Sequence, residues 1–454
     1  MVLCTEIAPF PLNWGLPRKV IIIGGGLAGC EAAWQLALRG IAVTLFEMRP
    51  VQTTDAHQTD RLAELVCSNS LKSDQSPSAS WLLKEELRRL GSLLTTVAAK
   101  SRVPGGQALT VDRVAFAEGA TEAIENHPLI EVRREERTHI DPAEVTIIAT
   151  GPLTSGALAE EIGRLSGAGR LYFYDSISPI VDAATIDRSI VFAASRYDKS
   201  LDGTGDYLNC PMNRAEYEAF LDSLIAAEAV EAHVPNDVPY FEACLPIEEI
   251  ARRGRDTLRF GPMKPMGLTD PRTGRRPWAV VQLRQENLRA DSFNLVGFQN
   301  HLRFAEQKRI LRMIPGLGNA EFLRFGQIHR NTYINAPELL NGTLQLRAHP
   351  NVFFAGQLSG VEGYVESIAT GLVAGRFAAQ WTTGGMPAAF PRETAIGSLC
   401  HYISHADPKR YQPANIAFDL LPVPDPAPKD RRERQTLVTD RALAALAAYM
   451  TSHV

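Results

Sequence analysis

The stretch from Lys19 to Glu47, KVIIIGGGLAGCEAAWQLALRGIAVTLFE, constrains the fold more than any other part of the chain. It opens with a short β-branched apolar run, which is typical of a strand buried in a parallel sheet. Three glycines follow, and then a stretch of helical character that Gly40 ends. A second apolar run, residues 41–47, ends on Glu47. A strand-helix-strand unit of about 30 residues predicts an α/β fold with a parallel sheet.

The glycines have the spacing of a phosphate-binding loop, Gly24-x-Gly26-x-x-Gly29. The first permits a tight turn, the second lets a pyrophosphate approach the backbone, and the third lets the helix pack close to the strand. The helix N-terminus adds free N–H groups and a partial positive charge. An acid at the end of the second strand can accept hydrogen bonds from ribose hydroxyls. The sequence therefore predicts a dinucleotide site. Its expected residues are Gly24, Gly25, Gly26, Leu27, Ala28, Gly29 and Glu47.

Two later strand-glycine turns favour FAD over NAD as the dinucleotide. Residues 144–151, EVTIIATG, predict a buried strand that ends at Gly151. The segment NVFFAGQLSG, from residue 351, repeats this pattern of a buried strand followed by a glycine and places Gly356 and Gln357 after the strand. An extended flavin needs such a second turn to hold its ribityl and ring portions; the alternative is two ordinary strand ends. The sequence contains no second GxGxxG motif, so NADH or NADPH would have to dock on the flavin directly.

The pattern of turn residues and strand-forming runs changes twice along the 454 residues of the sequence. Between 176 and 314 turn residues are frequent and the expected strands are short, as at 188–197 and 276–285. From 351 the buried-strand texture returns, and a glycine-containing helix is expected at 364–381. Residues 420–435 are typical of a proline- and charge-rich linker before a closing helix at about 437–450. We expect a first part of the dinucleotide domain at 18–175, an inserted α+β domain at 176–314 and a second part at 315–454.

Composition limits the class of protein. A net charge of −4 provides no global basic field, so any contact with nucleic acid must be local. The six cysteines lack zinc-type or CxxC spacing, which predicts neither a metal site nor a disulfide framework. The N-terminus lacks the pattern of a secretory signal, and no uncharged apolar run reaches the roughly 18 residues of a membrane span. We expect a cytoplasmic protein without membrane contact.

One local stretch is strongly basic. Residues 252–278 contain eight Lys and Arg against two Asp, a balance of +6. Such a stretch, from Arg252 to Arg276, can neutralise the phosphates of RNA, and the alternative is a solvated loop face.

Two cysteines stand in unusual surroundings. Cys67 lies in LVCSNSLKSD, where small polar residues replace the aliphatic neighbours of a structural cysteine. Polar neighbours can stabilise the thiolate, which is the nucleophilic form. Cys244 lies in YFEACLPIEE, where Glu242 and Glu248 would raise the pKa of the thiol if either were close. The alternatives are a loop position without a role for Cys67 and core packing for Cys244.

Several long segments resemble one family. They are ELVCSNSLKSD, FEACLPIEEIARRGRDTLRFGPMKPMGL, NLVGFQNHLRFAEQKRILRMIPGL, HRNTY and FFAGQLSGVEGYVESIATGLVAG. These segments are similar to the folate- and FAD-dependent tRNA (uracil-5-)-methyltransferases, the smaller relatives of the GidA flavoproteins. The resemblance covers nearly the whole chain, from residue 20 to about 425. It implies an FAD-binding Rossmann-like domain of the glutathione-reductase type (GR2) with an inserted α+β domain.

The resemblance implies formation of 5-methyluridine at position 54 of the tRNA T-loop. The carbon would come from 5,10-methylenetetrahydrofolate and the hydride from FADH2, which NADH or NADPH regenerates. The resemblance also places two active-site cysteines at Cys67 and Cys244 and leaves open which one is the nucleophile. A thiolate that adds at C6 of uracil makes C5 nucleophilic, which explains the need for a reactive cysteine. Gly363 and Tyr364, in the SGVEGY loop, are expected to contact the cofactor or the folate.

Three alternatives are compatible with these residues. The same chemistry could serve a ribosomal RNA uridine. A GidA-like modification of the tRNA wobble uridine is disfavoured, because the chain has no room for the C-terminal helical domain of the larger relatives. The non-enzymatic alternative is a flavin-containing RNA-binding protein without turnover.

Overall fold

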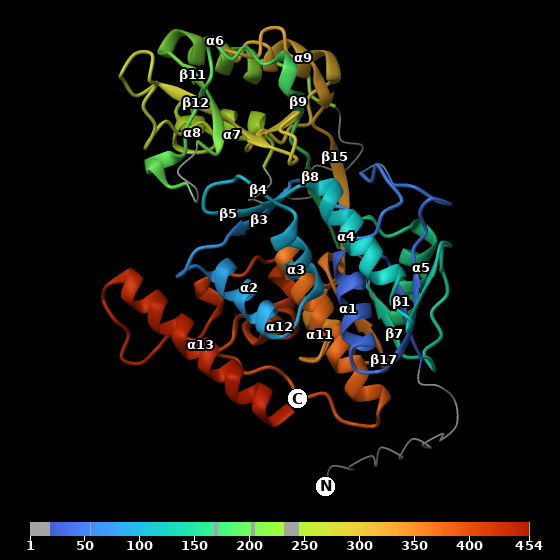
Figure 1. The fold of residues 1–454 in the computed structure, drawn as a ribbon. Helices are drawn as coiled ribbons and strands as arrows, with labels where there is room; N and C mark the ends of the chain where they lie inside the picture. The colour runs from blue at the N-terminus through green and yellow to red at the C-terminus, as the bar shows by residue number, and fades with distance from the viewer. Residues whose placement is uncertain (1–18, 55, 168–170, 201–204, 231–244, 454) are drawn as a thin grey trace.

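The computed structural model describes residues 19–54, 56–167, 171–200, 205–230 and 245–453. The chain forms two lobes that lie one above the other in Figure 1. The lower lobe is built from the N-terminal third and the C-terminal third of the sequence, and the upper lobe from the segment between them. An α/β fold with an inserted domain is therefore confirmed.

The sheet of the lower lobe has the strand order β16-β17-β7-β1-β2-β6. All neighbours in it are parallel except the edge strand β16. The central strand carries the first apolar run, and its Val20 and Ile22 are wholly buried. The bounds in sheet order are β16 Gln345–Leu346, β17 His349–Phe354, β7 Thr146–Ile148, β1 Lys19–Ile23, β2 Ala42–Phe46 and β6 Ile130–Arg133.

Two helices of this lobe pack unusually close together. A Cβ added at Gly371 of α11 (Tyr364–Thr382) would lie 2.3 Å from the carbonyl oxygen of Ala28 in α1 (Leu27–Ala37). One turn further along, a Cβ at Gly375 would lie 2.6 Å from the carbonyl oxygen of Ala32. Glycines at this spacing let two helix backbones touch. Both helices begin at the same cleft, described below. The other helices of the lobe are α2 Ala79–Arg89, α3 Leu93–Lys100, α4 Arg113–Glu125, α5 Gly156–Ser166, α10 Ala336–Leu339 and α12 Ala395–His405.

The upper lobe has its own antiparallel sheet, in the order β10-β11-β12-β13-β9-β14, and its own hydrophobic core. The expected strand at 188–197 shrinks to the two residues of β10, while the expected strand at 276–285 corresponds to β12. The last strand, β14, lies past residue 314, so the sheet extends beyond the expected domain boundary. The bounds are β10 Phe192–Ala193, β11 Tyr207–Met212, β12 Ala279–Gln285, β13 Ser292–Leu295, β9 Ile180–Asp182, β14 Phe322–Arg324, α6 Arg214–Ile225, α7 Ile247–Arg252, α8 Thr257–Phe260 and α9 Phe304–Leu311.

Two small sheets lie between the lobes (Figure 1). β8 (Leu171–Ser176) pairs antiparallel with β15 (Ile328–Tyr333), so the chain enters and leaves the upper lobe side by side. β3 (Ser70–Ser73), β5 (Ala108–Val111) and β4 (Arg102–Val103) form a three-stranded sheet in the lower lobe, on the side of the upper one. The segment that carries Cys67 leads directly into β3 and therefore lies at the boundary between the lobes.

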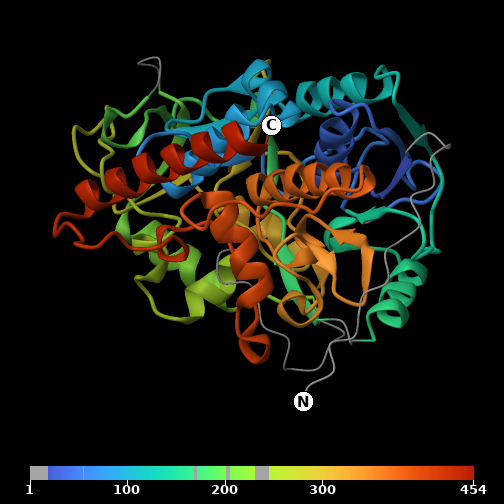
Figure 2. The same ribbon diagram turned by 90° about the horizontal axis from the view of Figure 1, so that it is seen from below.

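The closing helix, α13 (Arg431–His453), is longer than expected and crosses the molecule beside α2 (Figure 2). The expected linker at 420–435 is wrong in its last five residues, which form the first turns of α13. Pro428 is the last helix breaker of the linker, and the Asp430 carboxylate then accepts a 2.8 Å hydrogen bond from the Glu433 N–H, as an N-cap does. Across the described ranges, the helices are all too short or too polar to span a membrane.

Candidate active site

The glycine loop joins β1 to α1 as its spacing predicts. Gly24 has φ of +105°, which favours glycine. A Cβ at Gly29 would lie only 1.8 Å from the Gly24 carbonyl oxygen, so this glycine allows the helix to meet the turn. Gly26 is the N-cap of α1, and a Cβ there would meet no protein atom within 4 Å. The space in front of Gly26, at a helix N-terminus, fits a pyrophosphate.

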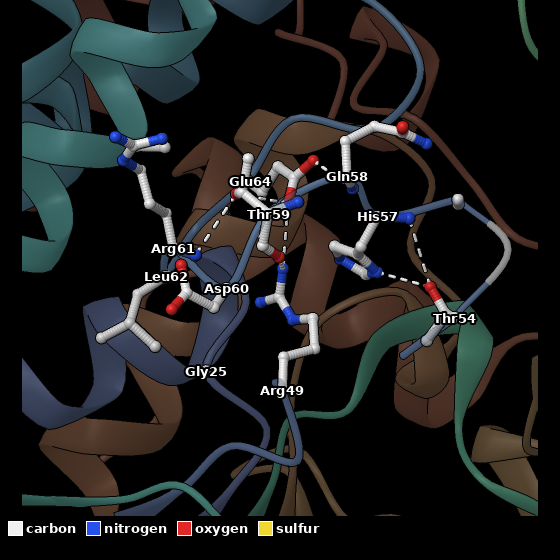
Figure 3. A network of polar contacts seen from close by, with 12 residues as sticks. Gly25, Arg49, Thr54, His57, Gln58, Thr59, Asp60, Arg61, Leu62 and Glu64 are labelled. Atoms are coloured by element: carbon white, nitrogen blue, oxygen red, sulfur yellow. Dashed lines mark hydrogen bonds and ion pairs between the residues drawn. The ribbon is translucent and has the colours of Figure 1, made fainter. Parts of the chain in front are cut away.

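Glu47, at the end of the second strand, lies beside this loop. Its Oε2 accepts a 3.0 Å hydrogen bond from the Gly25 N–H, and its Oε1 pairs with Arg49 Nε at 2.9 Å. Burial alone would raise the pKa of the Glu47 carboxyl, but Arg49 outweighs burial and lowers that pKa. Arg49 is itself buried and makes a second ion pair, at 3.0 Å, with Glu64 (Figure 3). The acid is therefore held ionised and in place.

A solvent-open cleft of about 1000 Å³ runs from this loop across the carboxyl ends of the strands. Its second wall is the turn after β17, where Gly356 has φ of +74° and donates its N–H to Thr370 Oγ1 at 2.8 Å. A Cβ at Gly356 would lie 3.0 Å from Ala28 Cβ, so the two turns meet. Ten of the twelve expected cofactor residues line the cleft: Gly24, Gly25, Gly26, Leu27, Ala28, Glu47, Gly151, Gly356, Gln357 and Tyr364. Gly29 lies behind the loop, and Gly363 lines the neighbouring cavity.

That neighbouring cavity, of about 950 Å³, contains Cys67. Five residues line both cavities, so the two are adjacent and share a wall: Val66, Pro152, Leu153, Gln357 and Tyr364. The Tyr364 hydroxyl accepts hydrogen bonds from the backbone N–H groups of Cys67 at 2.8 Å and of Ser68 at 3.0 Å. Burial raises the pKa of Tyr364, and the charge of Cys67 adds to that effect. Tyr364 therefore fixes the cysteine turn as well as lining the cofactor cleft.

Arg113, the first residue of α4, holds the same turn from the other side. Its Nη1 donates to the Leu65 carbonyl at 2.8 Å and its Nη2 donates to the Cys67 carbonyl at 3.0 Å. The guanidinium also pairs with Glu286, which follows β12 in the upper lobe. Burial opposes the charge of Arg113, but Glu286 outweighs it and raises the pKa.

Two further arginines from the upper lobe reach the turn. Arg284 of β12 donates from Nε to Asn69 Oδ1 and from Nη2 to Ser68 Oγ, each at 2.8 Å. Arg324 of β14 donates from Nη1 to the Val66 carbonyl at 3.0 Å. Sequence reasoning missed these arginines and Arg113, because their partners lie about 46 to 258 residues away along the chain.

A polar cluster closes the cavity below Cys67. Lys72 Nζ pairs with Glu366 of α11 at 2.8 Å and donates to Asn415 Oδ1. Glu366 is wholly buried and also accepts from the Ile416 N–H at 3.0 Å. Gly363 has φ of +107°, a backbone conformation that favours glycine. The cluster joins the cysteine segment to α11 and to the segment after α12.

The other cysteines cannot be added to this site from the described residues. Cys244 and Glu242 are outside the described residues. Cys30 is buried in the core and donates its thiol to the Gly25 carbonyl at 3.3 Å, as a structural cysteine would. The described residues contain no cluster of three His, Cys, Asp or Glu side chains that could hold a metal ion.

The basic stretch covers one side of the upper lobe, and four of its arginines are neutralised by acids. These pairs are Arg252 with Glu249, Arg255 with Asp222, Arg259 with Asp256 and Arg272 with Asp270. Arg275 and Arg276 pair with no carboxylate of the described residues and line an open groove. Phe260, 78% exposed, and Trp278 line the same groove.

Three features of the parallel sheet define the class of protein. A glycine loop follows its first strand, an acid follows its second, and a second glycine turn faces the loop. Together they define a dinucleotide-binding protein of the flavoprotein type. The family model described as "Glucose inhibited division protein A" matches residues 19–385, and the chain belongs to that family.

Close relatives narrow the comparison. The chain is 68% identical over 440 residues to the methylenetetrahydrofolate--tRNA-(uracil-5-)-methyltransferase TrmFO of Solibacter usitatus, covering 96% of this chain and 99% of the relative. It is 51% identical over 437 residues to the enzyme of the same name from Enterococcus faecalis, covering 96% and 100%. Among solved structures, Aquifex aeolicus GidA aligns with a TM-score of 0.69 at 18% identity, covering 96% of this chain and 73% of that one. This last likeness shows the fold.

Proposed function

We propose that this chain is a methylenetetrahydrofolate--tRNA-(uracil-5-)-methyltransferase that forms 5-methyluridine at position 54 of the T-loop. Its near full-length relatives carry the name of this activity at 51% to 68% identity. The observation that carries the proposal is the adjacency of two cavities, because the dinucleotide cleft shares five lining residues with the cavity that contains Cys67. A uridine held at Cys67 is thereby next to the end of the cleft where a flavin ring would lie.

FAD and methylenetetrahydrofolate are the cofactors that this activity requires. When bound, the folate supplies the one-carbon unit, and the reduced flavin, regenerated by NADH or NADPH, supplies the hydride. The glycine loop and Glu47 would hold the dinucleotide phosphates and ribose, while Gly356 and Gln357 would line the far end. The open space in front of Gly26 fits this assignment.

The residues of the second cavity suit the uracil. The Cys67 thiolate adds to C6, and C5 then forms a bond to the one-carbon unit, whose bond to the donor nitrogen would break to leave an exocyclic methylene for the hydride to reduce. A base must next remove the C5 proton before the sulfur can leave C6. We propose that Cys244 removes that proton. The trapping experiment below tests which of the two roles belongs to Cys67 and which to Cys244.

RNA containing 5-fluorouridine at the target position tests this chemistry. Fluorine at C5 cannot leave as a proton, so the bond between sulfur and C6 should persist through denaturation. Cys67→Ala should lose both methylation and the trapped complex and keep its flavin. Cys400→Ala, which removes a buried thiol of α12, should keep both. Trapping by Cys67→Ala but not by Cys244→Ala would exchange the two roles.

A transcript of tRNA and a fragment of ribosomal RNA distinguish the substrates. With methylenetetrahydrofolate and NADH, mass analysis of nuclease fragments should find 5-methyluridine at position 54 of the tRNA transcript and none in the ribosomal fragment. Tight tRNA binding without any product under these conditions would instead identify a flavin-containing RNA-binding protein.

We also propose that the basic stretch from Arg252 to Arg276 binds the tRNA backbone. The unpaired Arg275 and Arg276 support the groove side of this stretch as the contact, with the exposed Phe260 available to stack on a base. Arg275→Glu with Arg276→Glu should weaken tRNA binding and lower the slope of log affinity against log salt by about 1.4 to 1.8. The matched control is Arg431→Glu with Arg432→Glu on exposed turns of α13. Equal losses in the two double variants would remove the groove from the interface.

A further inference from the structure

Two positive charges at the cysteine turn form no ion pair with a carboxylate of the described residues. Arg284 is only 7% exposed, and its hydrogen bonds go to the neutral side chains of Ser68, Asn69 and Asn294. Arg324 is half-buried and donates only to backbone carbonyls. Neither guanidinium forms an ion pair with an acid of the described residues. Taking a cation out of water is costly unless an anion compensates for it.

The side chains around the turn leave a positive balance. The charged and titratable groups that face the turn or its cavity come from five places: Arg113 on α4, Arg284 and Glu286 on and after β12, Arg324 on β14, Lys72 on β3, and Glu362 and Tyr364 before and in α11. Two of these charges are compensated close by, because Arg113 pairs with Glu286 and Lys72 pairs with Glu366. Glu362 adds a negative charge to the cavity, and Arg284 and Arg324 are the two cations of this set that form no ion pair with the described residues.

We propose that Arg284 and Arg324 are positioning residues that fix the turn 65–69 and supply the positive charge that favours the thiolate form of Cys67. The proposal rests on the proposed function, in which Cys67 acts as a thiolate, either as the nucleophile or as the base that takes the C5 proton. Positive charge beside a thiol favours the thiolate, and the hydrogen bonds to Val66, Ser68 and Asn69 hold the turn on both sides of the cysteine.

The electrostatics of the arginines agree with this assignment. Burial lowers the pKa of Arg284, and negative charge on Glu286, Tyr207 and Cys67 acts in the opposite direction. Burial and the like charge of Arg113 lower the pKa of Arg324, while Cys67, Tyr364 and Glu64 act in the opposite direction. A negative charge on Cys67 and the two guanidinium groups would therefore stabilise one another across the boundary between the lobes (Figure 1).

The test is the rate at which iodoacetamide alkylates Cys67 in the flavin-loaded protein between pH 5.5 and 9.5, read by mass analysis of the peptide that contains it. The thiolate displaces iodide and forms a thioether, so the rate follows the thiolate fraction. In Arg284→Gln the pH midpoint should rise by about one unit, and labelling below the midpoint should slow by about tenfold. Arg324→Gln should shift it in the same direction, and Arg284→Lys should restore most of the wild-type profile.

The controls separate charge from folding. Arg164→Gln, an exposed arginine paired with Glu161, should leave the profile unchanged. The buried Cys30, Cys210 and Cys400 report the fold, because they label only when the protein opens. If these thiols label in Arg284→Gln, that variant has unfolded and Arg324→Gln decides the result.

Ser68→Ala separates charge from the hydrogen bond, since it removes the hydroxyl that binds Arg284 and keeps the guanidinium. It should leave the midpoint in place. A wild-type midpoint in both Arg284→Gln and Arg324→Gln, with the buried thiols protected, overturns the proposal, and so does an equal shift in Ser68→Ala. Labelling requires neither tRNA nor folate, so this outcome is independent of whether the protein methylates RNA.

Discussion

Gly26 and Gly29 belong to one loop, yet the structure predicts opposite effects of placing alanine at each. A Cβ at Gly26 points into space that no protein atom within 4 Å occupies, whereas a Cβ at Gly29 would overlap the Gly24 carbonyl oxygen at 1.8 Å. The first substitution should leave the apo fold intact and obstruct the ligand. The second should destabilise the fold itself.

The magnitudes follow from these positions. Gly26 has φ of −77°, which alanine adopts without strain. Alanine at an N-cap lowers the free energy of unfolding by up to about 1 kcal/mol relative to glycine. The smaller conformational freedom of the unfolded chain raises that free energy by about 0.4 to 1 kcal/mol. The unfolding free energy of the apo protein should thus change by less than about 0.5 kcal/mol. A methyl group between the backbone and the pyrophosphate would remove about two charge-assisted hydrogen bonds of about 1.5 kcal/mol each, so FAD affinity should fall at least about 100-fold.

At Gly29 the clash is between two backbone-attached atoms, and neither can turn away as a long side chain could. Overpacking of this kind costs about 3 kcal/mol or more, and the helix propensity of alanine returns only about 1 kcal/mol. Gly29→Ala should therefore lose about 2 kcal/mol of stability even without ligand.

Urea unfolding of the apo proteins and fluorescence titration with FAD measure the two quantities separately. Gly156→Ala serves as a control for glycine loss outside the loop, since a Cβ there also meets nothing within 4 Å and φ lies outside the range that strains alanine. Wild-type affinity for FAD in Gly26→Ala would refute the placement of the pyrophosphate at this loop. An apo protein as stable as wild type in Gly29→Ala would refute the contact between helix and turn.

Two further predictions concern buried charges. Lys72→Met should lower the unfolding free energy by about 2 kcal/mol, which is less than for a fully buried pair because Lys72 is 36% exposed while Glu366 is wholly buried. In urea unfolding, the double variant with Glu366→Gln should recover most of this loss. An unchanged unfolding free energy in Lys72→Met would contradict the pairing. Glu47, whose pKa is lowered by Arg49 against the effect of burial, should stabilise the fold fully above pH 5, with the contribution lost as the pH falls below about 4.3 toward the lower pKa of the folded state. Unfolding measured from pH 8 to 3 should therefore give a constant difference of about 2 kcal/mol between wild type and Glu47→Gln down to pH 5, narrowing below it; a difference that widens in acid would reverse the sign of the argument.

The parts of the fold that local pattern determines could be predicted from the sequence. The strand at Lys19–Ile23, the helix after it and the helix at Tyr364–Thr382 appear within a residue or two of their expected bounds. Their apolar periodicity and glycines describe contacts that each segment makes with its own neighbours in the sheet. Ten expected cofactor residues line one cleft for the same reason, since the carboxyl ends of parallel strands meet at one edge.

The environment of Cys67 could not be predicted in this way. Its neighbours Arg113, Arg284, Arg324 and Tyr364 come from four separate elements, and nothing in the spacing of their own segments marks a contact with residue 67. Polar composition around the cysteine indicated reactivity, but the charges that support it arrive from the other lobe. Such contacts are fixed by tertiary packing, which a local pattern does not encode.

This dependence on two lobes has a mechanical consequence. The dinucleotide loop belongs wholly to the lower lobe, whereas the cysteine turn is bound by Arg284 and Arg324 of the upper lobe and by Tyr364 of the lower one. Only the paired strands β8 and β15 carry the chain between the lobes within the described residues. A shift of one lobe against the other would leave the dinucleotide site unchanged and would move two guanidinium groups relative to Cys67. Flavin binding and thiol reactivity are therefore separable properties of this fold, and a substitution between the lobes should alter the second while sparing the first.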